Sequence, residues 1–157
     1  MAMKRLVLIV TSMLLGSFAL AAPATSVSAS RAVIKTAYNA TLKKTIIVDG
    51  RGRTIYLLIS DSGGVPSCAA LSPACPKAWP AVATQGKPIA GKGINAALLG
   101  TAKGAGGVQQ VTYKKHPLYF FHGGFGAPAG DKQPGHVRGQ GFYGIWYVLS
   151  PKGNAIK

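Results

Sequence analysis

The sequence predicts an all-β protein that folds as one compact domain. Segments rich in β-branched and aromatic residues alternate with glycine-rich turns, and one hairpin pattern occurs twice. About 130 residues follow the N-terminal leader, a length that suits a single domain with its own core. We therefore expect two pseudo-symmetric β-hairpin repeats in a small sandwich or barrel-like fold, with at most one short helix near 94–99.

Residues 1–22 have the order of a signal peptide. Lys4 and Arg5 precede an apolar run and the small residues Ala19-Leu20-Ala21, although cleavage after Ala29 would also satisfy the pattern. The apolar run is shorter than the roughly 20 residues that span a bilayer, so we expect no transmembrane span after signal removal. No cysteine stands at the cleavage site, so we expect a periplasmic or secreted bacterial protein that is not lipid-anchored.

Residues 23–42 are predicted to be a linker and first strand region, and residues 43–157 the domain itself. Repeat 1 covers about 43–82 and pairs segment 45–48 with 54–59; repeat 2 covers about 108–150 and pairs 108–113 with 118–121. Tyr56 and Tyr119 correspond at an offset of 63, and Trp79 and Trp146 at an offset of 67. A unit that cannot bury its apolar face alone usually packs against its copy.

Cys68 and Cys75 are the only cysteines. In an exported chain, two cysteines are most simply a disulfide. A haem attachment would need Cys-x-x-Cys-His, and a structural zinc site would need two more ligands nearby. The pairing Cys68–Cys75 is therefore our prediction.

These features resemble a known family. The chain has the pattern Val-Asp-x-x-Gly-Arg-Thr-x-Tyr-x-x-x-x-Asp over 48–61, Thr-Tyr-x-x-His-Pro-Leu-Tyr-x-Phe over 112–121, and Trp-Tyr-Val-x-Ser-Pro-x-Gly over 146–153. This order is similar to the bacterial secreted-repeat family of predicted lipoproteins with a Tyr-x-aromatic-x-x-Asp motif, over about residues 43–156. The resemblance implies export and carries no established activity.

The chain departs from that motif in both copies. The aromatic position is Leu58 in the first copy, whereas the second copy keeps Tyr119 and Phe121. Gly124 stands where the second aspartate is expected. We expect the insertion between His122 and Asp131 to displace this acid to Asp131.

Tyr56 and Asp61 are not expected to touch each other. A separation of five places them on opposite faces of a strand, with backbones about 16 Å apart. Tyr56 is therefore expected to pack or hydrogen-bond on one face, while Asp61 accepts backbone N–H groups in the following turn. Because a buried acid needs a partner, Asp61 would find one across the repeats, in Tyr119, Lys114 or Lys115.

The glycine-rich insertion 122–136 offers a second kind of site. His122, Asp131 and His136 bracket this loop, and three such ligands would bind a transition metal if the loop folded back. No other cofactor is expected. A solvated loop without metal is the simpler interpretation.

The charge balance indicates the class of partner. Of 18 Lys and Arg residues, Lys4 and Arg5 leave with the signal, so 16 bases and three acids give the mature chain +13. Such an excess attracts polyanions, and the bases are dispersed rather than clustered. No catalytic motif is present and acids are scarce, so we expect no enzyme. Nucleic acid is not an expected partner in this compartment; an anionic lipid or glycan surface, or another envelope protein, is.

Overall fold

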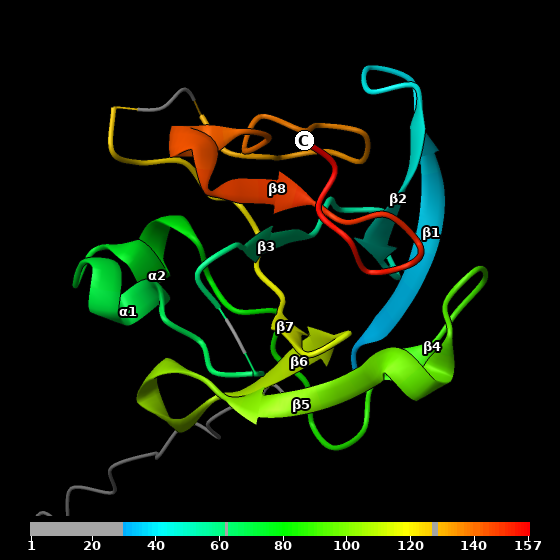
Figure 1. Ribbon diagram of the computed structural model, residues 1–157, viewed down its shortest axis with the longest axis horizontal. Coiled ribbons are helices and arrows are strands. Elements are labelled where there is room, and N and C mark those ends of the chain that lie inside the picture. The colour runs from blue at the N-terminus through cyan, green and yellow to red at the C-terminus, as the bar shows by residue number, and fades with distance from the viewer. Residues whose placement is uncertain (1–29, 62, 127–128) are drawn as a thin grey trace, which may run out of the picture.

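The computed structural model describes residues 30–61, 63–126 and 129–157, so the predicted signal peptide lies outside the described residues. The described chain forms three small β-sheets arranged around a common centre (Figure 1). The strand orders are β2-β1-β4, β3-β8 and β5-β6-β7. The all-β single domain is confirmed, as three short sheets rather than one closed sheet.

The elements are short because turns interrupt the chain every few residues. The strands are β1 (Val33–Asn39), β2 (Lys44–Asp49), β3 (Tyr56–Leu58), β4 (Ile89–Ala90), β5 (Leu99–Lys103), β6 (Gln109–Tyr113), β7 (His116–Pro117) and β8 (Trp146–Val148). The one-turn helices are α1 (Cys68–Leu71) and α2 (Cys75–Ala78), and the 3-10 turns are η1 (Ala96–Leu98), η2 (Ala105–Gly107) and η3 (Phe142–Gly144).

The main partner of β2 is β1 rather than the strand that follows it. β1 and β2 form an antiparallel ladder from Ile34 opposite Asp49 to Asn39 opposite Lys44. β2 and the β3 segment meet at a single bridge, Val48 with Thr54. The pairing predicted between 45–48 and 54–59 is therefore wrong as a continuous ladder. The β-branched composition identified the strands, but it does not specify which strand pairs with which.

The two repeats meet in the middle of the fold. Tyr56 and Tyr119 form an antiparallel bridge in which each backbone N–H donates to the other's carbonyl oxygen at 2.9 Å. Trp79 and Trp146 stack face to face, with ring centroids 3.9 Å apart and planes 1° apart. Residues at equivalent positions of the two repeats thus contact each other, as expected from the sequence offsets of 63 and 67.

Helical content exceeds the sequence prediction. The segment near 94–99 does form a turn, η1, in which the side chain of Asn95 accepts from the backbone N–H of Ala97. Two further one-turn helices, α1 and α2, flank the disulfide, and Pro76 occupies the first turn of α2. A helix of four residues has too few positions to display a 3.6-residue hydrophobic period, so no sequence pattern could indicate it.

The buried residues form two clusters. One surrounds the stacked tryptophans and includes Tyr56, Tyr119 and Phe121; the other lies between β2, β6 and the segment before β3 and includes Ile47, Val111 and other aliphatic residues. The first cluster is the one that holds the residues of the family motif. In the described ranges, no helix is long and apolar enough to cross a membrane.

Candidate functional site: two crossed tyrosine–aspartate pairs

Tyr56 lies at the start of β3 and is completely buried. Its hydroxyl group donates a hydrogen bond to Oδ2 of Asp131 at 2.5 Å and accepts one from the backbone N–H of Gly139 at 3.2 Å. Its ring packs edge-on against Trp79, with centroids 5.4 Å apart. The phenol therefore joins the first repeat to the glycine-rich loop of the second.

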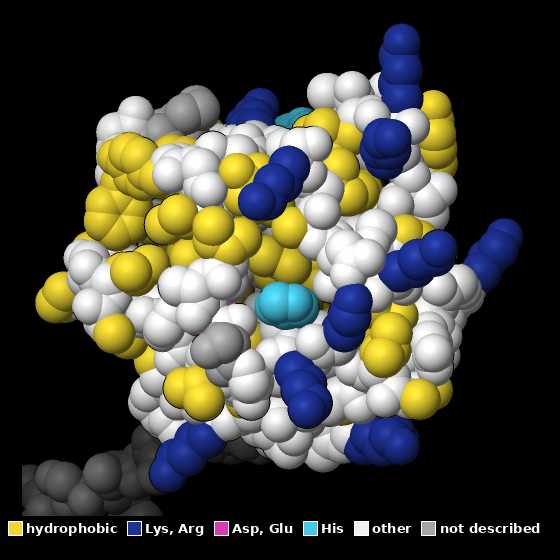
Figure 2. All heavy atoms as spheres, viewed as in Figure 1, with side chains coloured by type: hydrophobic (Ala, Val, Ile, Leu, Met, Phe, Trp, Pro, Cys, Tyr) yellow, Lys and Arg dark blue, Asp and Glu magenta, His cyan; other side chains and the backbone are white. Residues whose placement is uncertain are grey.

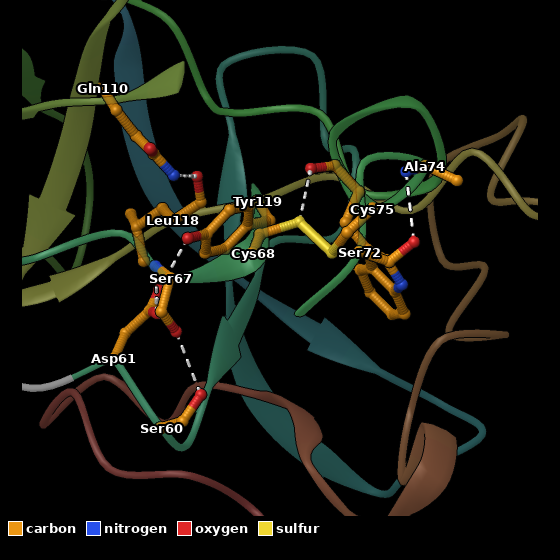
Figure 3. Close-up of a disulfide and its surroundings, with 11 residues drawn as sticks. Ser60, Asp61, Ser67, Cys68, Ser72, Ala74, Cys75, Gln110, Leu118 and Tyr119 are labelled. Atoms are coloured by element: carbon orange, nitrogen blue, oxygen red, sulfur yellow. Dashed lines mark hydrogen bonds between the residues drawn. A yellow bond between two sulfur atoms is a disulfide. The ribbon is translucent and has the colours of Figure 1, made fainter. Parts of the chain in front are cut away.

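Tyr119 makes the reciprocal contact. Its hydroxyl group donates to Oδ2 of Asp61 at 2.6 Å, and Asp61 is only 1% exposed. The other carboxylate oxygen of Asp61 accepts from the backbone N–H of Ser67 at 2.7 Å and from its hydroxyl at 2.6 Å. Figure 3 shows Tyr119, Asp61 and Ser67 converging beside the disulfide. Among the partners predicted for Asp61, Tyr119 is the one found, and the lysines are not bonded to it.

Asp131 occupies the place that Asp61 has in the first repeat. The backbone N–H of Asp61 donates to the carbonyl of Leu58, and that of Asp131 donates to the carbonyl of Phe121, the residue equivalent to Leu58. Asp131 also accepts a backbone N–H, from Arg138 at 2.9 Å. The expected displacement of the second aspartate past Gly124 is confirmed by these contacts.

Two glycines make this displacement possible. The insertion returns so closely to the chain that a Cβ on Gly130 would overlap the backbone of His122. A Cβ on Gly139 would lie 2.6 Å from the Trp79 ring and 3.0 Å from the phenol carbon of Tyr56. Arg138 secures the loop further, because its guanidinium donates to the carbonyl oxygens of Ala129 and Gly130.

Both phenols are held in their neutral form. Burial raises the pKa of Tyr56 well above its ordinary range, and the hydrogen bond to Asp131 and that carboxylate's negative charge raise it further. Burial likewise raises the pKa of Tyr119, with Asp61 acting in the same direction. The two tyrosines are therefore hydrogen-bond donors to carboxylates rather than bases or nucleophiles at neutral pH.

Phe121 completes the motif as a packing residue. It is 1% exposed, and its ring centroid lies 4.4 Å from that of Trp79 and 6.4 Å from that of Tyr56. Tyr119 packs edge-on against Trp146 at 5.1 Å. The sequence identified Phe121 and the tyrosines, whereas the partners Ser67, Gly139 and the tryptophan stack emerge only in the fold.

The predicted disulfide is present. Cys68 and Cys75 are bonded, with Cα atoms 5.5 Å apart, and both are 3% exposed. The bond closes α1 and α2 over the tryptophan cluster, directly after Ser67. It therefore also fixes the residue that donates twice to Asp61.

The three predicted metal ligands do not assemble. Both carboxylate oxygens of Asp131 accept hydrogen bonds, from Tyr56 and from Arg138. Nδ1 of His136 accepts from the backbone N–H of Lys132 at 3.4 Å, and the side chain of His122 is exposed. In the described part of the chain, no three His, Cys, Asp or Glu side chains lie close enough to hold a metal ion. In this structure Asp131 is an acceptor of hydrogen bonds within the fold, and metal binding by 122–136 stays a prediction.

The third carboxylate is also engaged. Oδ1 of Asp49 accepts from the backbone N–H groups of Arg51 and Arg53, and its Oδ2 pairs with Nε of Arg53 at 2.8 Å. Each aspartate of the chain is thus used within the fold. Figure 2 shows the result on one face, where Lys and Arg side chains project widely and Asp or Glu is scarcely visible.

Comparison with known proteins supports the resemblance seen in the sequence over its second half. Neither a curated protein nor a solved structure matches this chain significantly. A family described as a secreted repeat of unknown function matches residues 100–150, a segment that includes Tyr119, Asp131 and Trp146. The second repeat of this chain, which supplies Tyr119 and Asp131 to the two tyrosine–aspartate pairs, is therefore similar to the secreted repeat of unknown function.

Proposed function

We propose that this protein is an exported, non-enzymatic component of the cell envelope that binds an anionic envelope component through its cationic surface. The observation that carries the proposal is the use of all three carboxylates inside the fold. Asp49 and Asp61 are buried and Asp131 is bonded to Tyr56, so the carboxylates are engaged inside the fold while the bases project outward, and three acids oppose 16 bases. The net charge of +13, from 16 Lys and Arg residues and three acids, therefore makes the surface potential positive, and of these bases Arg53 is paired with Asp49.

The state of the buried motif supports a role without catalysis. Tyr56 and Tyr119 are enclosed and neutral, and each is committed to an aspartate. A general acid or base must reach its substrate and titrate near the working pH. The crossed pairs meet neither requirement and act as fold-holding contacts between the repeats.

The distribution of charge supports a surface rather than a pocket as the binding element. Exposed lysines lie at opposite parts of the fold, for example Lys43 and Lys44 at the β1–β2 turn and Lys87 and Lys92 on either side of β4. Attraction to an anionic surface adds about 1 kcal/mol for each Lys or Arg that comes close to it. Salt screens that attraction, because the Debye length is only about 8 Å at physiological ionic strength.

The test is cosedimentation of the mature protein with phosphatidylglycerol-containing vesicles, and in parallel with vesicles of phosphatidylcholine alone. We expect binding to the anionic vesicles only, weakening steeply as salt rises. The variants Lys43→Gln/Lys44→Gln and Lys87→Gln/Lys92→Gln should each weaken binding several-fold at low salt. Equal binding to neutral vesicles, or binding to neither kind with no retention on a soluble anionic glycan, would reject the proposal.

A further inference from the structure

An exposed aromatic patch lies against the tryptophan stack. It consists of Leu71, Phe125, Phe142, Tyr143 and Ile145, which together line a shallow cavity of about 220 Å³ whose floor includes Trp79 and Trp146. Tyr143 is 71% exposed, Leu71 51% and Phe125 41%. Figure 2 shows hydrophobic side chains gathered on the side of the molecule where Figure 1 places α1, α2 and the turn before β8.

The backbone of this patch is strained as well as exposed. Phe125 has φ = 55° and Tyr143 has φ = 48°, in the left-handed region that bulky residues rarely adopt. Elsewhere among the described residues, the non-glycine residues with positive φ are lysines at turns: Lys43, Lys114 and Lys115. The hydroxyl of Tyr143 donates to the carbonyl oxygen of Phe125 at 3.2 Å, so the two loops hold each other. Backbone of this kind costs about 1–3 kcal/mol per residue, persists where neighbouring contacts hold it, and clusters at functional sites.

The chemistry of the patch limits what can cover it. Its lining is mostly apolar, and the hydroxyl groups in it are those of Ser72 and Tyr143, the latter bonded to Phe125. A sugar would leave its hydroxyl groups without partners there. A second copy of this chain would bring another +13 charge against the first, so self-association is opposed by repulsion. An anionic bilayer matches both the apolar patch and the net positive charge of the protein, because it has an apolar interior and a negatively charged surface.

We infer that the aromatic patch inserts its exposed side chains into the interface of an anionic lipid bilayer, and this inference rests on the proposed function. Electrostatic attraction brings the cationic protein to the headgroups. Tyr143, Phe125 and Leu71 then occupy the boundary between headgroups and acyl chains, where aromatic rings are favoured. Lys77 is exposed on α2, the helix whose Cys75 lines the cavity, and supplies a cation on that element.

The experiment compares salt-sensitive and salt-resistant binding of the full mature chain to phosphatidylglycerol-containing vesicles. The test variant is Phe125→Asn/Tyr143→Asn, because asparagine tolerates a left-handed backbone and the fold should be retained. The control is Tyr38→Thr, which removes a similarly exposed tyrosine (68%) from β1, away from the patch. At high salt we expect the parent and the control to keep a residual bound fraction, and the asparagine variant to bind about tenfold more weakly.

A second readout does not depend on the stability of that variant. Tyr143→Trp should show a blue-shifted emission spectrum and quenching by brominated lipid when anionic vesicles are added, whereas Tyr38→Trp should show neither. Two buried tryptophans in the parent provide the background for both.

The outcomes separate the two proposals. One set of results would show that insertion is wrong and that the cationic surface alone carries the function. These results are that salt abolishes all binding, that the asparagine variant binds like the parent, and that Tyr143→Trp shows no spectral shift. If the asparagine variant loses binding to an anionic glycan or a protein but not to vesicles, the patch has another occupant and the lipid assignment falls. If anionic vesicles do not bind the parent at any salt concentration, the inference fails together with lipid as the anionic component, while retention on the glycan would preserve the broader proposal.

Discussion

Tyr56 donates its hydroxyl hydrogen to Asp131, 75 residues along the chain, and not to the aspartate of its own motif. Asp61 is bonded instead to Tyr119 of the other repeat at 2.6 Å. Each repeat thus supplies one donor and one acceptor to the other. One oxygen of each carboxylate is bonded within its own repeat, by Ser67 for Asp61 and by Arg138 for Asp131, and the other oxygen is bonded by the tyrosine of the opposite repeat.

A double-mutant cycle should detect this crossing. We expect Tyr56→Phe and Asp131→Ala to be coupled by about 1–3 kcal/mol in the free energy of unfolding, because they share one hydrogen bond. Tyr56→Phe and Asp61→Ala should be additive within about 0.5 kcal/mol. Urea denaturation of the single and double variants measures both terms. Coupling of Tyr56 with Asp61 and none with Asp131 would contradict the crossed arrangement.

The stability of the protein should fall steeply at alkaline pH. The folded pKa of each buried tyrosine is raised above the ordinary value of 10.0, so the unfolded chain loses these two protons first. The stabilisation is complete below pH 10 and declines above it, with a slope approaching about 2.7 kcal/mol per pH unit for two groups. The measurement is the free energy of unfolding as a function of pH from pH 8 upward. A Tyr56→Phe/Tyr119→Phe variant, which carries the same lysines, should lose stability with a shallower slope against pH. Equal slopes would show that these phenols ionise in the folded state.

The disulfide should contribute more than its small loop suggests. Cys68 and Cys75 are seven positions apart, and closing such a loop is worth about 2–3 kcal/mol on the chain-entropy scale. Cys68→Ser/Cys75→Ser should cost at least this amount, because the loop also positions Ser67 against Asp61. Combining the cysteine variant with Ser67→Ala tests the link: the two changes should be non-additive in thermal or urea unfolding. Strict additivity would mean that the disulfide does not support Asp61.

Gly139→Ala should be among the most damaging small substitutions. The added methyl group would overlap the Trp79 ring and the Tyr56 phenol, and overpacking of a rigid core typically costs about 1–3 kcal/mol or more. Gly106 has φ = 65° and open space around it, so Gly106→Ala should show only the backbone cost of about 1 kcal/mol. A thermal shift for Gly139→Ala no larger than that for Gly106→Ala would mean that the aromatic core can move aside.

The family motif was visible in the sequence because it is local, but its partners were not. Periodicity and spacing identified Tyr56, Asp61, Tyr119 and Phe121, and strand parity excluded a contact between Tyr56 and Asp61. The offset between Trp79 and Trp146 was also available, although it does not specify stacking. Nothing local indicated that Asp131 would bond to Tyr56 rather than face His122 and His136. That contact depends on how the insertion folds back at Gly130.

The sequence by itself determined the all-β class, the duplication, the disulfide and the cationic balance, because each follows from composition or from residues close together in the chain. Only the tertiary structure decided which strands pair, as β2 shows by pairing with β1 rather than with β3. It also decided which aspartate each tyrosine is hydrogen-bonded to and which aromatic side chains are exposed at the surface. These outcomes depend on packing one repeat against the other, where a few hydrogen bonds and ring contacts across long sequence separations select one arrangement among several that the local pattern allows.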